Sequence, residues 1–227
     1  MQPVLKYIVF CCVILGLVAC GPDEKHARVE GKFKNIDNAM FYIYQASDAF
    51  TGFDTIRIEG GKFRYETPLD APAIFTLQYP NFSRILEPGQ TVKVSANAEH
   101  LAEIEINGTE ANARFSELRL KIEKEGGKNK LLAASQFIHD HATTLDGLAA
   151  YLFYFDEEPS VSASEKLALL QALQKGMPKN SAVTKLFSLR EAALRNGKGQ
   201  ALTSFEAVSL AGNPLRSADY LGKPLLI

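Results

Sequence analysis

Cysteine is scarce in this chain of 227 residues and is confined to its beginning. Cys11, Cys12 and Cys20 are present, and no cysteine follows them. A disulfide, a thiolate metal site or a cysteine nucleophile requires thiols in the folded part of a protein. The body of the chain is therefore predicted to have none of these three, and the chain by itself is predicted to have no dithiol activity.

Tryptophan is absent, and neither sign of charge predominates. The 25 lysines and arginines stand against 26 acids, which gives a formal net charge of −1. Because a nucleic-acid surface needs clustered positive charge, we expect no nucleic-acid partner. Hydrophobic residues make up 46% of the chain and charged residues 22%, as in an ordinary globular protein. This apolar fraction excludes a chain that stays solvated and unfolded.

A hydrophobic run of about twenty residues, the length that crosses a bilayer, is lacking as well. The apolar stretch over residues 7–19 is shorter, follows Lys6 and is followed at once by Gly21-Pro22. A short apolar run after a positive start is typical of a secretory signal peptide. The sequence therefore predicts a signal peptide over residues 1–19.

The apolar stretch ends in Leu17-Val18-Ala19-Cys20, which resembles the lipobox of bacterial lipoproteins. The resemblance implies cleavage before Cys20, lipidation of Cys20 and attachment to a membrane through that lipid. The alternative is an ordinary signal peptide that leaves Cys20 as a stray thiol. Gly21 is not the aspartate that resembles an inner-membrane retention signal, so we expect a lipid-anchored protein of the outer membrane in the cell envelope. Its periplasmic or surface face stays open, and residues 20–27 are expected to be a tether.

Short alternating segments, separated by turn residues, fill residues 28–108. Glu59-Gly60-Gly61 separates two of them as a hairpin turn does, because glycine tolerates positive φ. This pattern predicts an antiparallel β-sandwich. The expected strands are Val29–Phe33, Phe41–Tyr44, Phe53–Ile58, Lys62–Tyr65, Ala73–Gln78, Arg84–Leu86, Thr91–Val94 and Ile104–Ile106.

The hydrophobic period becomes helical over residues 109–200. Phe115, Leu118 and Ile122 recur on one helical face, and Ser162 with Glu165 forms a capping-box pair. We expect a small helical segment and hence an α+β fold. The expected helices contain Phe115–Ile122, Leu131–His141, Leu145–Phe155, Ser162–Gly176 and Val183–Leu194.

Strand-like patterns return over residues 201–227. Phe205–Leu210 alternates, Asn213-Pro214 predicts a turn, and Pro224–Ile227 is an apolar run. A β-α-β unit takes thirty or more residues, and this last segment is shorter. We therefore expect it to be the incomplete start of a further domain.

The last segment resembles the opening of a periplasmic thioredoxin-like domain, as in the thiol–disulfide oxidoreductases related to TlpA and ResA. The similarity lies in residues 199–227, with Phe205, Gly212 and Gly222-Lys223 at matching positions. The resemblance implies that residues 201–227 are the truncated start of a thioredoxin-like domain. The two redox cysteines and the cis-proline of that family would lie after Ile227, so no catalytic residue is carried over.

Earlier segments resemble the β-rich domain of unknown function that precedes thioredoxin-like domains in many Gram-negative lipoproteins. The matching text includes Gly31-Lys32-Phe33, Gly61-Lys62-Phe63, Leu86-Glu87-Pro88-Gly89 and Asn107–Asn112. The resemblance implies an N-terminal accessory or positioning part of a membrane-anchored thiol–disulfide oxidoreductase. The alternative hypothesis is a non-catalytic cell-envelope lipoprotein whose β-domain binds a peptide, glycan or protein partner.

Aromatic residues are enriched in the β segment and allow two interpretations. They line an exposed face that stacks sugars or holds a peptide, or they fill the core of the sandwich, which is the expected case. The residues are Tyr42, Tyr44, Tyr65, Tyr79 and Phe82.

Other motifs invite chemical interpretations that the sequence does not favour. His139-Asp140-His141 places its imidazoles about 200° apart on a helix, so they cannot meet one metal ion. Asp156-Glu157-Glu158 precedes a proline and is expected to be a solvated linker rather than a calcium or catalytic site. Gly126-Gly127-Lys128 lacks the spacing of a phosphate loop and predicts a plain turn. We expect no metal site and no cofactor.

One short motif suggests a covalent modification. Asp54-Thr55-Ile56 resembles the acceptor of O-glycosylation in some Gram-negative anaerobes. Thr55 is therefore a candidate O-glycosylation site.

Overall fold

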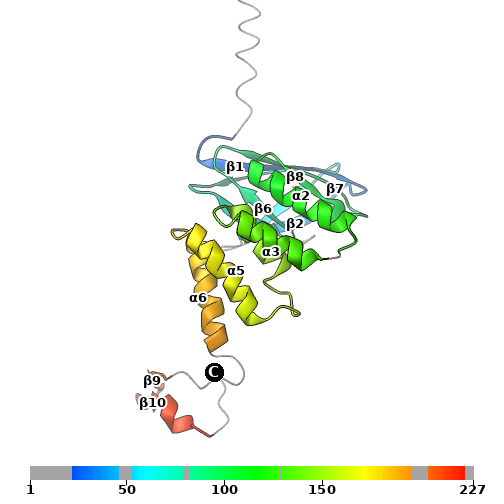
Figure 1. Cartoon of the computed structure of the whole chain (residues 1–227). Helices are drawn as coiled ribbons and strands as arrows, with labels where there is room; N and C mark the ends of the chain where they lie inside the picture. The colour runs from blue at the N-terminus through cyan, green and yellow to red at the C-terminus, as the bar shows by residue number, and fades with distance from the viewer. Residues whose placement is uncertain (1–21, 46–52, 79–81, 128, 196–203, 223–227) are drawn as a thin grey trace, which may run out of the picture.

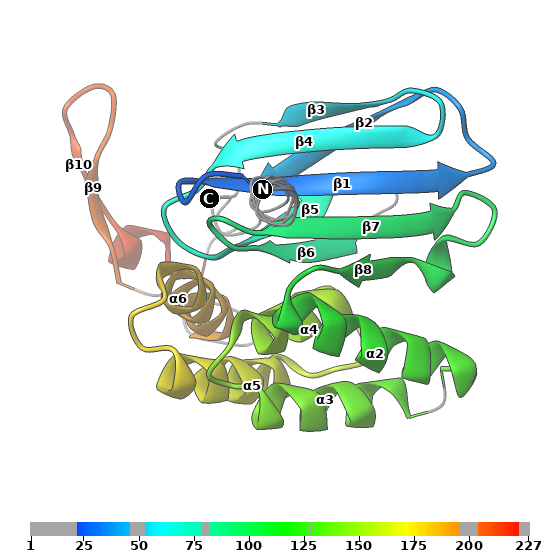
Figure 2. The same ribbon diagram turned by 90° about the horizontal axis from the view of Figure 1, so that it is seen from above.

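Two β-sheets and a group of helices make up most of the molecule in the computed structural model (Figures 1 and 2). The structure describes residues 22–45, 53–78, 82–127, 129–195 and 204–222. The predicted signal peptide, Cys20 and Gly21 at the start of the predicted tether, and the apolar run Pro224–Ile227 lie outside these ranges. None of the described helices is both long and apolar enough to cross a bilayer.

Each of the two main sheets has four strands. The first sheet has the order β4-β1-β7-β8, and the second has the order β3-β2-β5-β6. The strands of the first sheet are β1 (His26–Lys34), β4 (Lys62–Pro68), β7 (Thr91–Asn97) and β8 (Glu105–Asn107). Those of the second are β2 (Ala39–Gln45), β3 (Asp54–Ile58), β5 (Ala73–Leu77) and β6 (Phe82–Leu86).

The prediction of a purely antiparallel sandwich is wrong at one strand pair. β1 and β7 run parallel, with Val29 opposite Val92, whereas the other paired strands of both sheets are antiparallel. Parallel neighbours need a long connection between them. Here the chain passes through β2 to β6 before it returns as β7, and this path provides that connection. Alternation along a strand predicts which face is buried but not the direction of the neighbouring strand.

The sandwich core forms because alternate side chains of each strand point to the same face. On β2, Phe41 and Ile43 are buried, while Met40 and Tyr42 face away from the core. β1 begins earlier than expected, at His26, and Ala27 is fully buried in the core. The end of the predicted tether is therefore part of the sheet.

The expected helices are present, and they pack against the second sheet as well as against one another. The helices are α2 (Glu110–Lys124), α3 (Lys130–Asp140), α4 (Leu145–Tyr154), α5 (Ala163–Gly176) and α6 (Ser181–Arg195). The predicted capping box at Ser162 and Glu165 begins α5. Ile74 of β5 and Ile85 of β6 belong to the same buried cluster as the helices. α4 contacts both of these strands, so the helical segment shares a core with the β-rich part.

α2 closes one side of the sandwich with two polar side chains, one helical turn apart. Asn112 accepts a hydrogen bond from the Ile85 N–H at 2.9 Å and donates one to the Ile85 carbonyl at 2.6 Å. Ser116 bonds the N–H and carbonyl of Ile106 in the same way, at 3.2 and 2.8 Å. β6 and β8 are the outer strands of the two sheets. The two side chains therefore supply the hydrogen bonds that another strand would otherwise make.

A small hairpin follows α6. β9 (Glu206–Val208) pairs antiparallel with β10 (Pro214–Arg216), and the short 3-10 helix η2 (Ser217–Tyr220) comes next. The expected strand over Phe205–Leu210 is thus shorter than predicted, and β10 begins at the predicted turn residue Pro214. Three large apolar side chains of this segment are exposed, namely Val208, Leu210 and Leu221.

Candidate functional site

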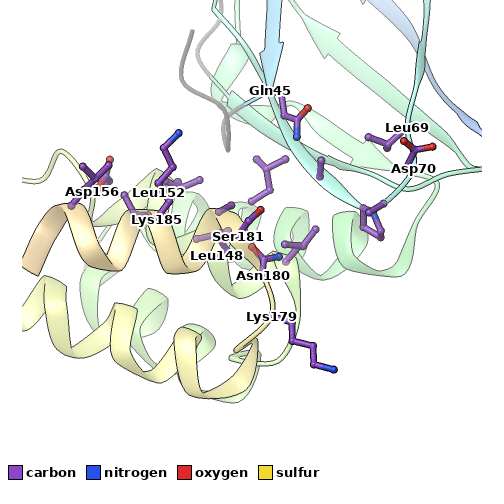
Figure 3. A pocket seen from close by; sticks show the side chains of 18 of the residues that line it. Gln45, Leu69, Asp70, Leu148, Leu152, Asp156, Lys179, Asn180, Ser181 and Lys185 are labelled. Carbon is purple, nitrogen blue, oxygen red and sulfur yellow. The ribbon is translucent and has the colours of Figure 1, made fainter. Parts of the chain in front are cut away.

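A groove of about 620 Å³ lies between the end of the second sheet and helices α4 and α6 (Figure 3). Gln45 and the connection from β4 to β5 form its sheet side. α4 and α6 form its helical side. Its apolar lining comprises Pro68, Leu69, Ala71, Pro72, Ala73, Ile74, Leu145, Leu148, Leu152, Ala182, Leu186 and Leu189.

The position of α6, which forms one wall of the groove, is fixed near both ends of the helix. At its beginning, the Asn180 side chain accepts a hydrogen bond from the Val183 N–H at 3.1 Å, and Val183 is fully buried. Toward its end, Arg190 donates two hydrogen bonds to Asp156, at 2.6 and 3.1 Å. Asp156 follows α4 directly, so this ion pair joins the two helical walls.

Polar side chains are few in the groove and lie at its rim. Ser181 and Lys185 are one turn apart on α6, and Gln45 extends from the sheet side toward them (Figure 3). The Lys179 side chain extends away from the other lining residues (Figure 3). Among the described residues, no acid forms an ion pair with Lys185. The α6 side of the groove therefore carries the unpaired Lys185 ammonium, and the sheet side carries the Asp70 carboxylate, for which the described residues show no ion pair either.

The Asp156-Glu157-Glu158 cluster is held by basic partners rather than left as a solvated linker. Asp156 binds Arg190, and Glu158 lies 3.1 Å from the Lys130 ammonium. Hydrogen bonds from Ser160, with that from Lys130, lower the pKa of Glu158 to about 2. The ion pairs with Lys130 and Arg190 therefore join the loop after α4 to α3 and to α6. The described part of the chain contains no group of three or more His, Cys, Asp and Glu side chains that could hold a metal ion.

The structure separates the residues of the His139-Asp140-His141 motif. The His141 Nδ1 atom lies 3.6 Å from the Asp146 carboxylate, and Asp146 is fully buried. Arg114 donates a hydrogen bond to Asp146 at 2.7 Å. His139 is exposed, and no contact joins it to this group in the part of the chain that the structure describes. The motif contributes to helix packing through His141 alone.

A second surface of interest is the solvent-facing side of β2 and β3, here called the open face. Met40 is 57% exposed and Tyr42 is 46% exposed. Tyr44 packs edge-on against Phe53, with ring centroids 5.4 Å apart. The prediction that these tyrosines fill the core is wrong for Tyr42, because Phe41 and Ile43 on the other side of the strand take that place.

The other aromatic residues of the β segment and the candidate glycosylation site differ in their burial and contacts. Tyr65 is partly buried, and its hydroxyl donates a hydrogen bond to Asp54 at 2.7 Å. Burial raises the pKa of Tyr65 to about 12. Tyr79 and the side chain of Phe82 lie outside the described residues. Thr55 is exposed on β3, which is one of the two outer strands of the second sheet, so an enzyme can reach this residue.

Sequence reasoning missed the groove and the two edge-binding side chains of α2. The groove joins residues from five elements and their connections, and no single pattern along the chain indicates such a combination. Asn112 belongs to the family-like motif Asn107–Asn112, but the sequence does not show its hydrogen bond to Ile85, because the two residues are 27 positions apart. Arg84 was also missed: it is fully buried on β6, and burial lowers its pKa to about 9.

Comparison with known proteins finds one family model that matches part of the chain. Residues 27–115 match the family described as a domain of unknown function, DUF4369. The match includes all eight strands of the two main sheets and ends inside α2, after Asn112. No curated protein and no solved structure gives a match.

Proposed function

We propose that this chain is the N-terminal accessory part of a membrane-anchored thiol–disulfide oxidoreductase of the TlpA/ResA-like, thioredoxin-fold family. In this proposal the lipid on Cys20 holds the protein at the outer membrane, and the sandwich with its helices positions a redox domain in the cell envelope. The match to DUF4369 supports the proposal, because that domain is often found in lipoproteins associated with thiol–disulfide oxidoreductases. The chain itself has no cysteine after Cys20 to carry out the chemistry.

The observation that carries the proposal is the segment after α6. Its sequence resembles the opening of a thioredoxin-like domain. Val208 and Leu210 are exposed in its hairpin, and Leu221 is exposed after η2. Large exposed apolar side chains within one short segment are typical of a surface that packs against another unit. A redox domain that follows the hairpin would cover them.

The proposal is tested by two measurements on the protein. A catalytic assay of insulin reduction should show no turnover with this chain alone, because thiol–disulfide exchange requires a thiolate. Metabolic labelling with palmitate should mark the protein in its host, and Cys20→Ala should abolish both the label and the membrane association. Insulin reduction by this chain, or an unlabelled protein, would contradict the proposal.

A second candidate function rests on the open face. Met40 and Tyr42 are exposed on β2, on the same side of the strand as the partly buried Tyr44. Phe53, which directly precedes β3, is also exposed and packs against Tyr44. Aromatic rings on a sheet face bind peptides or the apolar faces of sugars. A non-catalytic lipoprotein that binds a peptide, glycan or protein partner would bind it at the open face.

The second candidate makes its own prediction. A ligand found in peptide and glycan panels should raise the melting temperature of the protein, and Tyr42→Ala should remove that effect. Leu132→Ala is the matched control, since Leu132 is an exposed apolar residue on α3, away from the open face. Equal stabilisation of both variants would exclude the open face as the binding surface.

A further inference from the structure

We propose that the groove along α6 binds the alkyl chain of a free fatty acid, with the carboxylate at Lys185. This inference goes beyond the proposed function and does not depend on it. It rests on the lining of the groove, on the charge at its rim and on its volume.

The lining favours an alkyl chain over a sugar or a base. Among the described residues, the side chains that line the groove are leucine, isoleucine, alanine and proline with a few polar residues, and none of them is aromatic. Sugars and bases are held by stacking on aromatic rings and by several directed hydrogen bonds. Leu148 and Ile74 are buried at the base of the groove, whereas Leu189 remains 58% exposed on its wall. An alkyl chain would bury Leu189 without requiring directed polar contacts.

The charge at the rim favours a single anionic group. Arg190 neutralises Asp156, so Lys185 makes the α6 side of the groove locally positive, whereas the Asp70 carboxylate lies on the sheet side. The Ser181 hydroxyl lies one turn before Lys185 on the same face of α6 and can donate a hydrogen bond to a carboxylate. Asp70 lies on the opposite side of the groove (Figure 3) and would repel a second acidic group. These charges fit a monocarboxylate.

The volume of the groove favours a ligand with one chain. About 620 Å³ is within the range of roughly 300–1,000 Å³ that small-molecule sites occupy. Leu145, Leu148 and Leu152 succeed one another along α4 and give the apolar lining a direction along the groove. A linear amphiphile therefore matches the site in shape as well as in charge.

The test is calorimetric titration of the protein with octanoate, decanoate and dodecanoate below their micelle concentrations. Each added methylene should tighten binding roughly fourfold until the groove is full. Dodecanol, which lacks the charge, should bind roughly fivefold more weakly than dodecanoate. Affinity that does not change with chain length would overturn the proposal.

Two surface variants keep the test independent of folding. Lys185→Gln should weaken dodecanoate binding roughly fivefold and bring it to the level of dodecanol. Leu189→Glu should weaken it roughly tenfold or more, because an acid would then face the alkyl chain. Lys175→Gln, an exposed lysine on α5 outside the groove, is the matched control and should change nothing. Equal binding by all three variants, or binding of an apolar peptide but not of dodecanoate, would refute the proposal.

Discussion

Replacement of Asn112 by alanine tests how α2 closes the sandwich. The Asn112 side chain is 1% exposed and makes hydrogen bonds to the Ile85 N–H, the Ile85 carbonyl and the Thr109 hydroxyl. Asn112→Ala leaves both backbone groups of Ile85 buried without these partners. Each such group costs about 1–3 kcal/mol, so we expect a loss of about 3 kcal/mol in the free energy of unfolding. For a chain of this size the melting temperature should fall by roughly 6–12 °C.

The assay is urea unfolding followed by circular dichroism, with three companion variants. Asn112→Asp should destabilise at least as much, because a carboxylate oxygen would face the Ile85 carbonyl, which now accepts a hydrogen bond at 2.6 Å. Ser116→Ala should cost about 1–2 kcal/mol through the lost bonds to Ile106. Glu117→Ala, an exposed position on the same helix, should stay within about 0.5 kcal/mol of the parent. If Asn112→Ala is as stable as Glu117→Ala, the reasoning about edge closure is refuted.

Three further predictions concern the turn, the acid range and the modification site. Gly61→Ala should lower the melting temperature more than Gly60→Ala. Both glycines have positive φ, but only at Gly61 would the new Cβ lie 2.6 Å from a backbone oxygen, that of Phe33. Hydrogen bonds from Ser160 and Lys130 lower the pKa of Glu158 from 4.5 to about 2. Ionised Glu158 therefore contributes its full stabilisation at a pH above its pKa in the unfolded chain, and this stabilisation is lost as the pH falls toward 2. Other acids also protonate in this range, so both proteins should lose stability from pH 6 to pH 2, but the melting temperature of the parent should fall more than that of Glu158→Gln. Mass spectrometry of the native protein should find a glycan on the Thr55 peptide, and an unmodified peptide in the native host would contradict this.

The sequence predicts the order of the elements well, because each element has a local signal. The glycines after Glu59 mark the turn between β3 and β4, and the Ser162–Glu165 pair marks the start of α5. The α+β prediction is confirmed for this reason. The prediction of a hairpin at this turn is wrong, because β3 and β4 belong to different sheets and only an isolated bridge joins Glu59 to Lys62. The parallel pairing of β1 with β7 has no local signal, because it depends on the path of the chain between Lys34 and Thr91.

The candidate sites were harder to predict, for two physical reasons. Alternation on β2 gives two apolar faces, Phe41 with Ile43 and Met40 with Tyr42, and only the packing of the second sheet decides which pair is buried. The groove combines Gln45, Leu148 and Lys185, which are far apart in the sequence. Contacts between distant residues appear only when the elements pack together.

The most direct test of the central claim is a thiol count on the protein isolated from its native envelope with antibodies against the sandwich. The account predicts a lipidated protein that, after reduction, reacts with maleimide at two thiols belonging to a redox domain beyond the hairpin. A lipidated protein without any maleimide-reactive thiol would contradict the account.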